Sequence, residues 1–221
     1  ITIRYYEKLL RRLPGCQILW NVPFQEGTVP SDAREITVST LSQEDMRILS
    51  YFPGLETVHG EACTDYENLL QLWKQRPDLQ VIYSVALGAE SYGAGTDRVV
   101  LESVTQEQIS RLAYLPNLKS VLCSGGEGET VSRLQTYCRE HQLEFQIALG
   151  EEAISPDAET VTADAITDEQ LGLLEFLPEL KQLHLRRPKA SAEKLMRFQD
   201  SRPGLTLTWE QASNICFTML I

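Results

Sequence analysis

The chain has 221 residues, a hydrophobic fraction of 43% and a charged fraction of 23%, ordinary values for a globular protein large enough to bury a core. Its net charge of -11 excludes the basic surface that nucleic-acid binding requires. No apolar run approaches the ~18 residues of a membrane-spanning helix, so we expect no membrane insertion.

Similar segments recur along the chain about every 63 residues, a period that indicates a repeat architecture. The prolines that end equivalent segments are Pro53, Pro116 and Pro178. We therefore predict one continuous repeat domain over residues 1–221. Its parts are a partial repeat at 1–34, complete repeats at 35–97, 98–159 and 160–211, and a cap or tail at 212–221. Residues 1–34 match the second half of a repeat, so we interpret the chain as a processed or truncated piece.

The first half of each complete repeat predicts a strand, a short helix and a second strand. In residues 35–97 a β-branched strand at 36–39 is followed by Ser42 and, three residues later, Asp45, which is the pattern of a helix capping box. Thr105 with Gln108 and Thr167 with Gln170 repeat this pattern. A proline then ends the helix, and an L-x-x-L-x-L segment follows, as in Leu180 to Leu185.

The second half predicts another helix, near residues 66–75, 130–140 and 192–199, and a third strand with clean alternation. The apolar side of that strand contains Trp20, Tyr83 and Trp209. These rings could form a sugar-stacking ladder, but we interpret them as core residues beneath a half-buried strand. The polar loop at 88–96 is the expected place for a short hairpin.

On these residues the chain resembles leucine-rich repeat proteins, specifically the irregular type of secreted or surface-attached proteins of Gram-positive bacteria. The likeness rests on the three L-x-x-L-x-L segments and on the segment from Leu13 to Pro23. It implies an α/β solenoid with parallel strands on one face and helices on the other. We expect the strands that begin near Leu55, Leu118 and Leu180 to share one sheet, and an extra strand or hairpin of each repeat to lie on the helix side. The resemblance also implies a non-catalytic, protein-binding role outside the cell or at its surface.

Residues that could carry catalysis or bind metal do not form a convincing pattern. The five cysteines include no C-x-x-C pair, and Cys16 occupies a position held elsewhere by leucine, so we expect it to be buried. Cys138 and His141 lie one helical turn apart without an evident third partner. The glycine-rich segment 124–129 lacks the lysine of a phosphate-binding loop. We expect no enzyme activity, metal, cofactor or small-molecule ligand.

The outward side of the strands supplies the candidate binding site. Alternation places Thr37, Ser39, Thr57, His59, Val100, Glu102, Ser120, Leu122, Thr162, Asp164, Gln182, His184 and Arg186 there. Within this strip we predict a protein contact through His59, Val100, Glu102, Leu122, Gln182, His184 and Arg186. The alternative is an inert strip, with binding through loops. If each repeat adds two strands to a common sheet, His59 and His184 are roughly 19 Å apart and cannot share a metal ion.

Two other functions remain open at this point. The chain could be an acidic intracellular inhibitor or scaffold that binds a basic protein through its net charge. It could also be the targeting module of a larger enzyme.

Overall fold

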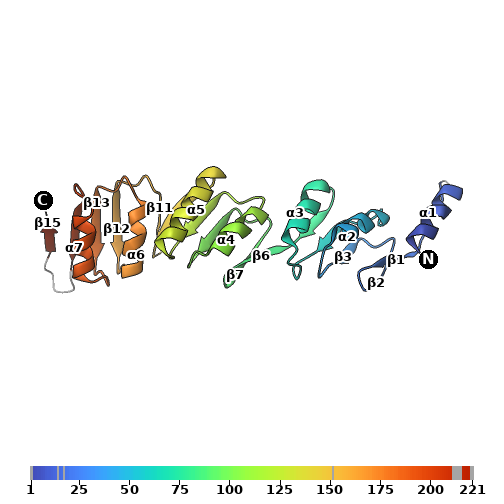
Figure 1. Ribbon diagram of the computed structural model, residues 1–221, viewed down its shortest axis with the longest axis horizontal. Helices are drawn as coiled ribbons and strands as arrows, with labels where there is room; N and C mark the ends of the chain where they lie inside the picture. Colours follow the sequence, from blue (N-terminus) through green and yellow to red (C-terminus); the bar gives the residue numbers. More distant parts are fainter. Residues whose placement is uncertain (1, 14, 17, 151, 211–215, 220–221) are drawn as a thin grey trace. The chain divides into compact units, whose positions relative to one another are not determined.

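The computed structural model describes residues 2–13, 15–16, 18–150 and 152–210, and the backbone of residues 216–219. The chain divides into two compact bodies. The first comprises Ile1–Val85, Ser91–Ala94 and Tyr114–Pro116, and the second comprises Ala86–Glu90, Gly95–Ala113 and Asn117–Ile221. Figure 1 shows the helices and strands of the chain and labels many of them.

The first body contains the partial repeat and most of the repeat 35–97. Its elements, in chain order, are α1 (Ile3–Arg12), β1 (Asn21–Phe24), β2 (Gly27–Pro30), β3 (Glu35–Thr37), α2 (Gln43–Ile48), the 3-10 helix η1 (Leu49–Tyr51), β4 (Thr57–His59), α3 (Tyr66–Gln75) and β5 (Gln80–Ile82). Strands β6 (Ser84–Leu87) and β7 (Glu90–Gly93) form an antiparallel hairpin at the end of this repeat.

The second body contains two further copies of the same order of elements. The first copy consists of β8 (Arg98–Leu101), α4 (Gln106–Arg111), the 3-10 helix η2 (Leu112–Tyr114), β9 (Ser120–Cys123), α5 (Gly128–Glu140), β10 (Glu144–Leu149) and β11 (Glu152–Ile154). The second consists of β12 (Thr160–Asp164), α6 (Asp168–Leu173), the 3-10 helix η3 (Leu174–Phe176), β13 (Gln182–Arg186), α7 (Ala192–Asp200), β14 (Thr206–Glu210) and β15 (Cys216–Met219).

The α/β class and the parallel strands are confirmed, but the expected sharing of strands is wrong. Each complete repeat has its own parallel sheet, in the orders β3-β4-β5, β8-β9-β10 and β12-β13-β14. The L-x-x-L-x-L strands β4, β9 and β13 are the central strands of three separate sheets. The third strand of a repeat lies in that sheet and not on the helix side, because a helical crossover returns the chain beside the strand it has just left.

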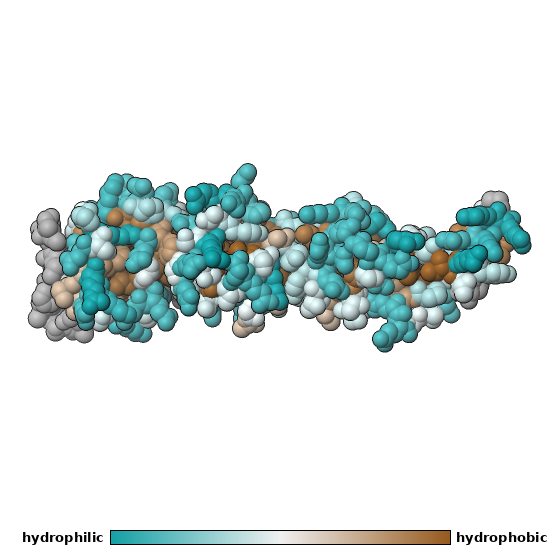
Figure 2. Space-filling model, in the orientation of Figure 1, coloured by the Kyte–Doolittle hydropathy of each residue, from teal (hydrophilic) through white to brown (hydrophobic). Residues whose placement is uncertain are grey.

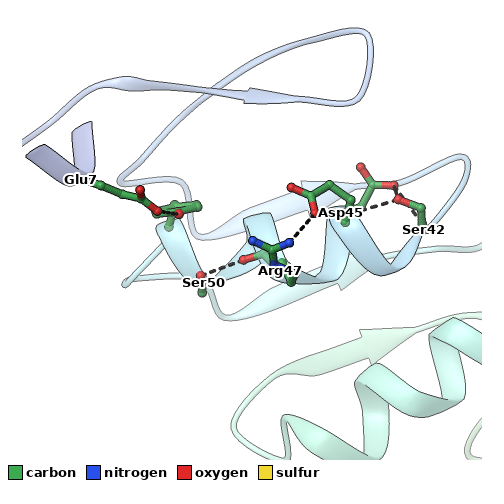
Figure 3. Close-up of polar contacts among 7 residues, drawn as sticks. Glu7, Ser42, Asp45, Arg47 and Ser50 are labelled. Atoms are coloured by element: carbon green, nitrogen blue, oxygen red, sulfur yellow. Dashed lines mark hydrogen bonds and ion pairs between the residues drawn. The ribbon is translucent and has the colours of Figure 1, made fainter. Parts of the chain in front are cut away.

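The helix starts form as the sequence predicts. Ser42, Thr105 and Thr167 each accept a hydrogen bond from the backbone N–H three residues on, and the side chain at that position accepts one from the backbone N–H of the capping residue. Figure 3 shows this reciprocal contact for Ser42 and Asp45. Each capped helix continues as a 3-10 turn that ends before the repeat's proline, so the segment is short and its position is fixed at both ends.

The core lies between each sheet and its two helices. The central strand residues Val58, Val121 and Leu183 are at most 1% exposed, and so are Leu69, Leu134 and Leu195 of the second helices. Trp20, Tyr83 and Trp209 are also buried, which confirms their interpretation as core residues. On the face that Figure 2 shows, hydrophilic side chains predominate and hydrophobic residues appear in narrow areas between them.

The predicted hairpin after the third strand is confirmed for β6–β7, and β10–β11 repeats it. Gly88 turns the β6–β7 hairpin with a φ of +74°, in the left-handed region, and an added Cβ would lie 2.7 Å from the Gln108 side-chain nitrogen. Both the backbone conformation and the close packing therefore favour glycine at this turn. In the last repeat, β15 pairs antiparallel with β14 and occupies the edge of that sheet.

Two neighbouring substitutions on β13 test the assignment of its faces. Leu183→Ala should lower the free energy of unfolding by about 2–5 kcal/mol, because it leaves a cavity at a side chain that is 1% exposed. Gln182→Ala, on the exposed side of the same strand, should change it by less than about 0.5 kcal/mol. Urea denaturation measures both values, and similar losses would contradict the assignment.

Candidate functional site

The helices leave open one face of the three parallel strands in each complete repeat. Consecutive right-handed crossovers place both helices of a repeat on the same side of its sheet, so alternate strand residues point away from them. In the last repeat this open side carries nine polar side chains. We call it the His184 face, formed by Thr160, Thr162, Asp164, Gln182, His184, Arg186, Thr206, Thr208 and Glu210.

Parallel pairing arranges the His184 face in three rows across the strands. Thr162 of β12 and Thr208 of β14 are the register partners of His184, which lies between them on β13. Asp164, Arg186 and Glu210 form the next row toward the ends of the strands. Because the three backbones are hydrogen-bonded to one another, the spacing of these side chains is set by the sheet.

The imidazole of His184 is held within this array. Its Nδ1 is 2.7 Å from the Thr208 Oγ1, at hydrogen-bonding distance, and its Nε2 is 3.8 Å from a Glu210 carboxylate oxygen. The side chain of His184 is 34% exposed, so one part of the ring is packed and the rest is accessible. An oriented and partly exposed histidine is suited to a directional contact with a partner.

The strand ends beside His184 carry an ion pair on a strained backbone. Arg187 donates from Nε to Asp164 Oδ1 at 3.2 Å and from a second guanidinium nitrogen to the other carboxylate oxygen. This contact, with smaller contributions from the charges of Arg187 and Arg186, lowers the pKa of Asp164 below its ordinary value. Ala165 and Arg187 both have positive φ, at 54° and 46°, which costs about 1–3 kcal/mol each for a residue other than glycine.

Lateral backbone hydrogen bonds hold these strained residues in place. The Ala165 N–H donates to the Arg186 carbonyl at 2.8 Å, and the Arg187 N–H donates to the Glu210 carbonyl at 3.0 Å. Strain of this kind concentrates at functional sites. The carboxyl-terminal half of the His184 face is therefore the strongest candidate site in the described part of the chain.

The predicted site residues are divided among three sheets. Gln182, His184 and Arg186 lie together on β13. Val100 and Leu122 are register partners on β8 and β9, and the exposed Glu102 follows β8. These two groups and His59 do not form the single strip that a shared sheet would have produced.

His59 lies on the open side of the β3-β4-β5 sheet. Its two ring nitrogens are each 3.5 Å from a carboxylate oxygen, of Glu35 and of Glu61. In the part of the chain that the structure describes, no group of three or more histidine, cysteine or acidic side chains is arranged to hold a metal ion.

The predicted strip does not include four members of the His184 face, Thr160 of β12 and Thr206, Thr208 and Glu210 of β14. The residues of β14 were missed because the third strand was expected on the helix side. The adjoining Arg187, which follows β13, was also missed. The polar alternation of Thr206 and Thr208 was visible in the sequence. It would have indicated this site if the third strand had been assigned to the same parallel sheet.

The described cysteines have no disulfide partner and differ in burial. Cys63, Cys123 and Cys138 are at most 1% exposed, and burial raises the pKa of Cys123 to about 11 and that of Cys138 to about 12. Cys138 is therefore a poor nucleophile, and the ring of His141 lies tilted against that of Tyr137. The prediction that Cys16 is buried is wrong, because it is exposed in the partial repeat.

A cleft of about 440 Å³ in the first body is a weaker candidate site. It is lined by α1, α2, η1 and α3. Glu7 of α1 accepts a 2.7 Å hydrogen bond from the Tyr51 hydroxyl, which raises the pKa of Tyr51 (Figure 3). Arg47 pairs with Glu44, and Arg76 pairs with Asp78. Because these charged groups already have partners within the chain, the cleft offers little unpaired charge to a ligand.

Comparisons with known proteins do not identify a family. No family model and no curated protein matches the chain. A solved structure of a protein from Bacteroides fragilis aligns with 82% of this chain and 66% of its own, at 15% identity and a TM-score of 0.26. This chain thus spans just under two thirds of that protein, and a likeness this low carries no inference about fold or function.

No helix in the described ranges combines the length and the apolar character needed to cross a bilayer.

Thiol labelling tests the burial of the cysteines. In a Cys216→Ser background at pH 8, one thiol per native chain should react rapidly with an aromatic disulfide reagent, and Cys16→Ser should abolish that reaction. A pKa of about 11 for Cys123 and about 12 for Cys138 leaves each thiolate fraction at or below roughly one in a thousand at this pH. Rapid labelling of two or more thiols in the folded protein would contradict these assignments.

Carboxyl NMR titration tests the Asp164 ion pair. The pKa of Asp164 should lie below its reference value of 3.8, and Arg187→Gln should raise it. Arg186→Gln should raise it less, because the Arg187 hydrogen bond is the largest cause of the shift.

The same pair has a defined effect on stability. A carboxyl whose pKa is depressed by folding stabilises the native state above its unfolded pKa, and that contribution is lost as pH falls through the folded value. The stability difference between the wild type and Arg187→Gln should therefore shrink at pH values well below 3.8. A difference that is constant through this range would contradict the assignment.

Proposed function

We propose that the chain is a non-catalytic protein-binding module, a solenoid of the leucine-rich-repeat type that a bacterium secretes or displays on its surface. The partner binds the His184 face. The observation that carries this proposal is the polar array itself, in which nine side chains of three paired strands point to the same open side. Such an array offers hydrogen-bond donors, acceptors and both signs of charge at fixed spacings.

The dimensions of the face favour a macromolecular partner with additional contacts. Three strands of five residues cover about 10 Å by 13 Å, or roughly 130 Å². A stable protein complex buries about 800 Å² on each partner, so a protein bound here also contacts neighbouring loops. The segment that follows Arg187 adjoins the face and is the first place where such contacts would form.

The setting of His184 supports binding rather than catalysis. A histidine near a carboxylate and a hydroxyl is a familiar arrangement in reaction centres, but those centres exclude water within a cleft. His184 projects from an open sheet and keeps about a third of its side chain exposed. In this setting its neighbours orient the ring for recognition.

The charge of the face does not favour an acidic inhibitor. Asp164 and Glu210 are opposed by Arg186 and by the adjoining Arg187. The net charge of -11 is therefore not concentrated at this site. A partner with mixed charges fits the face better than a strongly basic one.

Site-specific photocrosslinking tests the proposed function in cells that produce the protein. A benzophenone amino acid in place of Thr162 should crosslink a discrete protein, whereas the same residue in place of Met196 on α7 should not. Met196 is 41% exposed, so the control position is also accessible. Crosslinking from position 162 should fall by roughly tenfold when Arg186→Glu is added, because one buried charge contact is worth about 1.4 kcal/mol or more.

Folding of the Arg186→Glu variant is checked by its urea midpoint, which should stay within error of the wild type. Equal crosslinking from positions 162 and 196, or a yield that Arg186→Glu leaves unchanged, would show that the His184 face is not the binding surface.

A further inference from the structure

Apolar side chains of α1 and of the segment after it are exposed to solvent, whereas the equivalent side chains of the repeat 35–97 are buried. The period equates Trp20 with Tyr83, so α1 corresponds to α3, and Ile18–Trp20 correspond to Val81–Tyr83. In the complete repeat Leu72, Leu79 and Val81 are 2%, 6% and 6% exposed. Their counterparts in the partial repeat are only half-buried at Leu9 and Ile18 and exposed at Cys16.

Further apolar side chains lie on or near this surface. Leu10, Leu13 and Leu19 are 40%, 46% and 62% exposed. Figure 2 shows hydrophobic surface beside α1, at the right of the view. A contiguous apolar surface of this kind usually marks a contact with another element.

The backbone of the same segment also lacks the partner strand that its counterpart has. Gln80–Ile82 form β5, which pairs in parallel with β4. Within the described residues, Ile18 and Leu19 belong to no strand, whereas Trp20 bonds to Ser31 through its backbone. An apolar face and an unpaired edge therefore lie side by side in the chain.

The complete repeat shows what covers the equivalent surface. There, β4 supplies the neighbouring strand, and the half-repeat β3–α2–η1–β4 contacts α3. Leu41, just before α2, donates its backbone N–H to the Asp65 carboxylate, and its carbonyl accepts a hydrogen bond from the Asn68 side chain. Asp65 precedes the first residue of α3, and Asn68 lies in its first turn. Gly60 passes so close to Leu69 of α3 that an added Cβ would lie 2.8 Å from its side chain.

We propose that α1, Cys16 and Ile18–Trp20 form a docking surface for a strand–helix–strand half-repeat with the chemistry of residues 35–63. Its second strand pairs in parallel with Ile18–Trp20, and its alternating apolar residues cover Leu9, Cys16 and Ile18. In the repeat 35–97, the equivalent half-repeat directly precedes α3. The proposal is independent of the His184 face, which belongs to the other compact body.

A designed fusion tests the docking surface. A copy of residues 35–63 joined directly ahead of Ile1 preserves the 63-residue spacing of the complete repeat. Cys216→Ser and, in the copy, Cys63→Ser leave Cys16 as the reporting thiol. Docking should slow the labelling of Cys16 by roughly tenfold or more, because the reagent then reaches the thiol only through local opening.

Amide hydrogen exchange provides a second readout. In the chain without the fusion, the amide of Leu19 should exchange fast and that of its counterpart Ile82, which lies on the side of β5 that bonds to β4, should exchange slowly. The fusion should slow exchange at Leu19 toward the rate of Ile82, because a paired strand protects the N–H groups that face its partner.

The matched control is the same fusion with Val58→Asp and Phe52→Asp in the copy, which places charges on its core side. This copy should leave both Cys16 labelling and amide exchange at their original rates. Unchanged rates with the intact copy, or equal protection by the charged copy, would overturn the proposal. So would protection of Cys16 in the original chain that increases with protein concentration, because this would assign the surface to a second copy of the chain.

Discussion

The parallel hydrogen bonds between the second and third strands of each repeat hold the rest of the structure in register. They give the central strand a neighbour on both sides and place the third strand over the same two helices. Val58, Val121 and Leu183 can then be buried almost completely, while the residues between them remain on the open side. Without this pairing, the third strand would expose both its backbone edge and its apolar residues.

One framework therefore presents three different open faces. The face of β8–β9–β10 has Val100 and Leu122 at its centre, whereas the equivalent positions of β12–β13–β14 are Thr162 and His184. The buried sides vary much less, because each must fill the space beneath two helices. Differences in recognition can thus arise from the open side without changing the core. Among the described residues, only the last face combines a full polar array with strained strand ends.

Much of the local structure could be predicted because it depends on neighbouring residues. The capping boxes, the end of each first helix before a proline and the hairpin at Gly88 all follow from short-range rules. The placement of the third strand could not be obtained in this way, because alternation shows that one side is buried but not which strand lies beside it. Because of this error, residues of three separate sheets were predicted to form one strip, and Thr208 and Glu210 were not assigned to the site. Cys16 was misjudged for a related reason, since its counterpart Leu79 is buried in a complete repeat, whereas the partial repeat lacks the first half of those elements.

The hydroxyl of Tyr83 bonds to a residue beyond the end of its own repeat, which bears on where the chain can be cut. It donates a 2.8 Å hydrogen bond to the Tyr114 carbonyl, and the ring of Tyr114 lies against Tyr66, so residues from beyond position 97 complete the packing of the first compact body. Burial raises the pKa of Tyr83 to about 12, which keeps its proton available for this bond. A fragment cut at the repeat boundary would lose the acceptor of a buried phenol and uncover an aromatic ring. The first compact body therefore extends past the sequence period, to Tyr114 at the end of η2 and the proline that follows it.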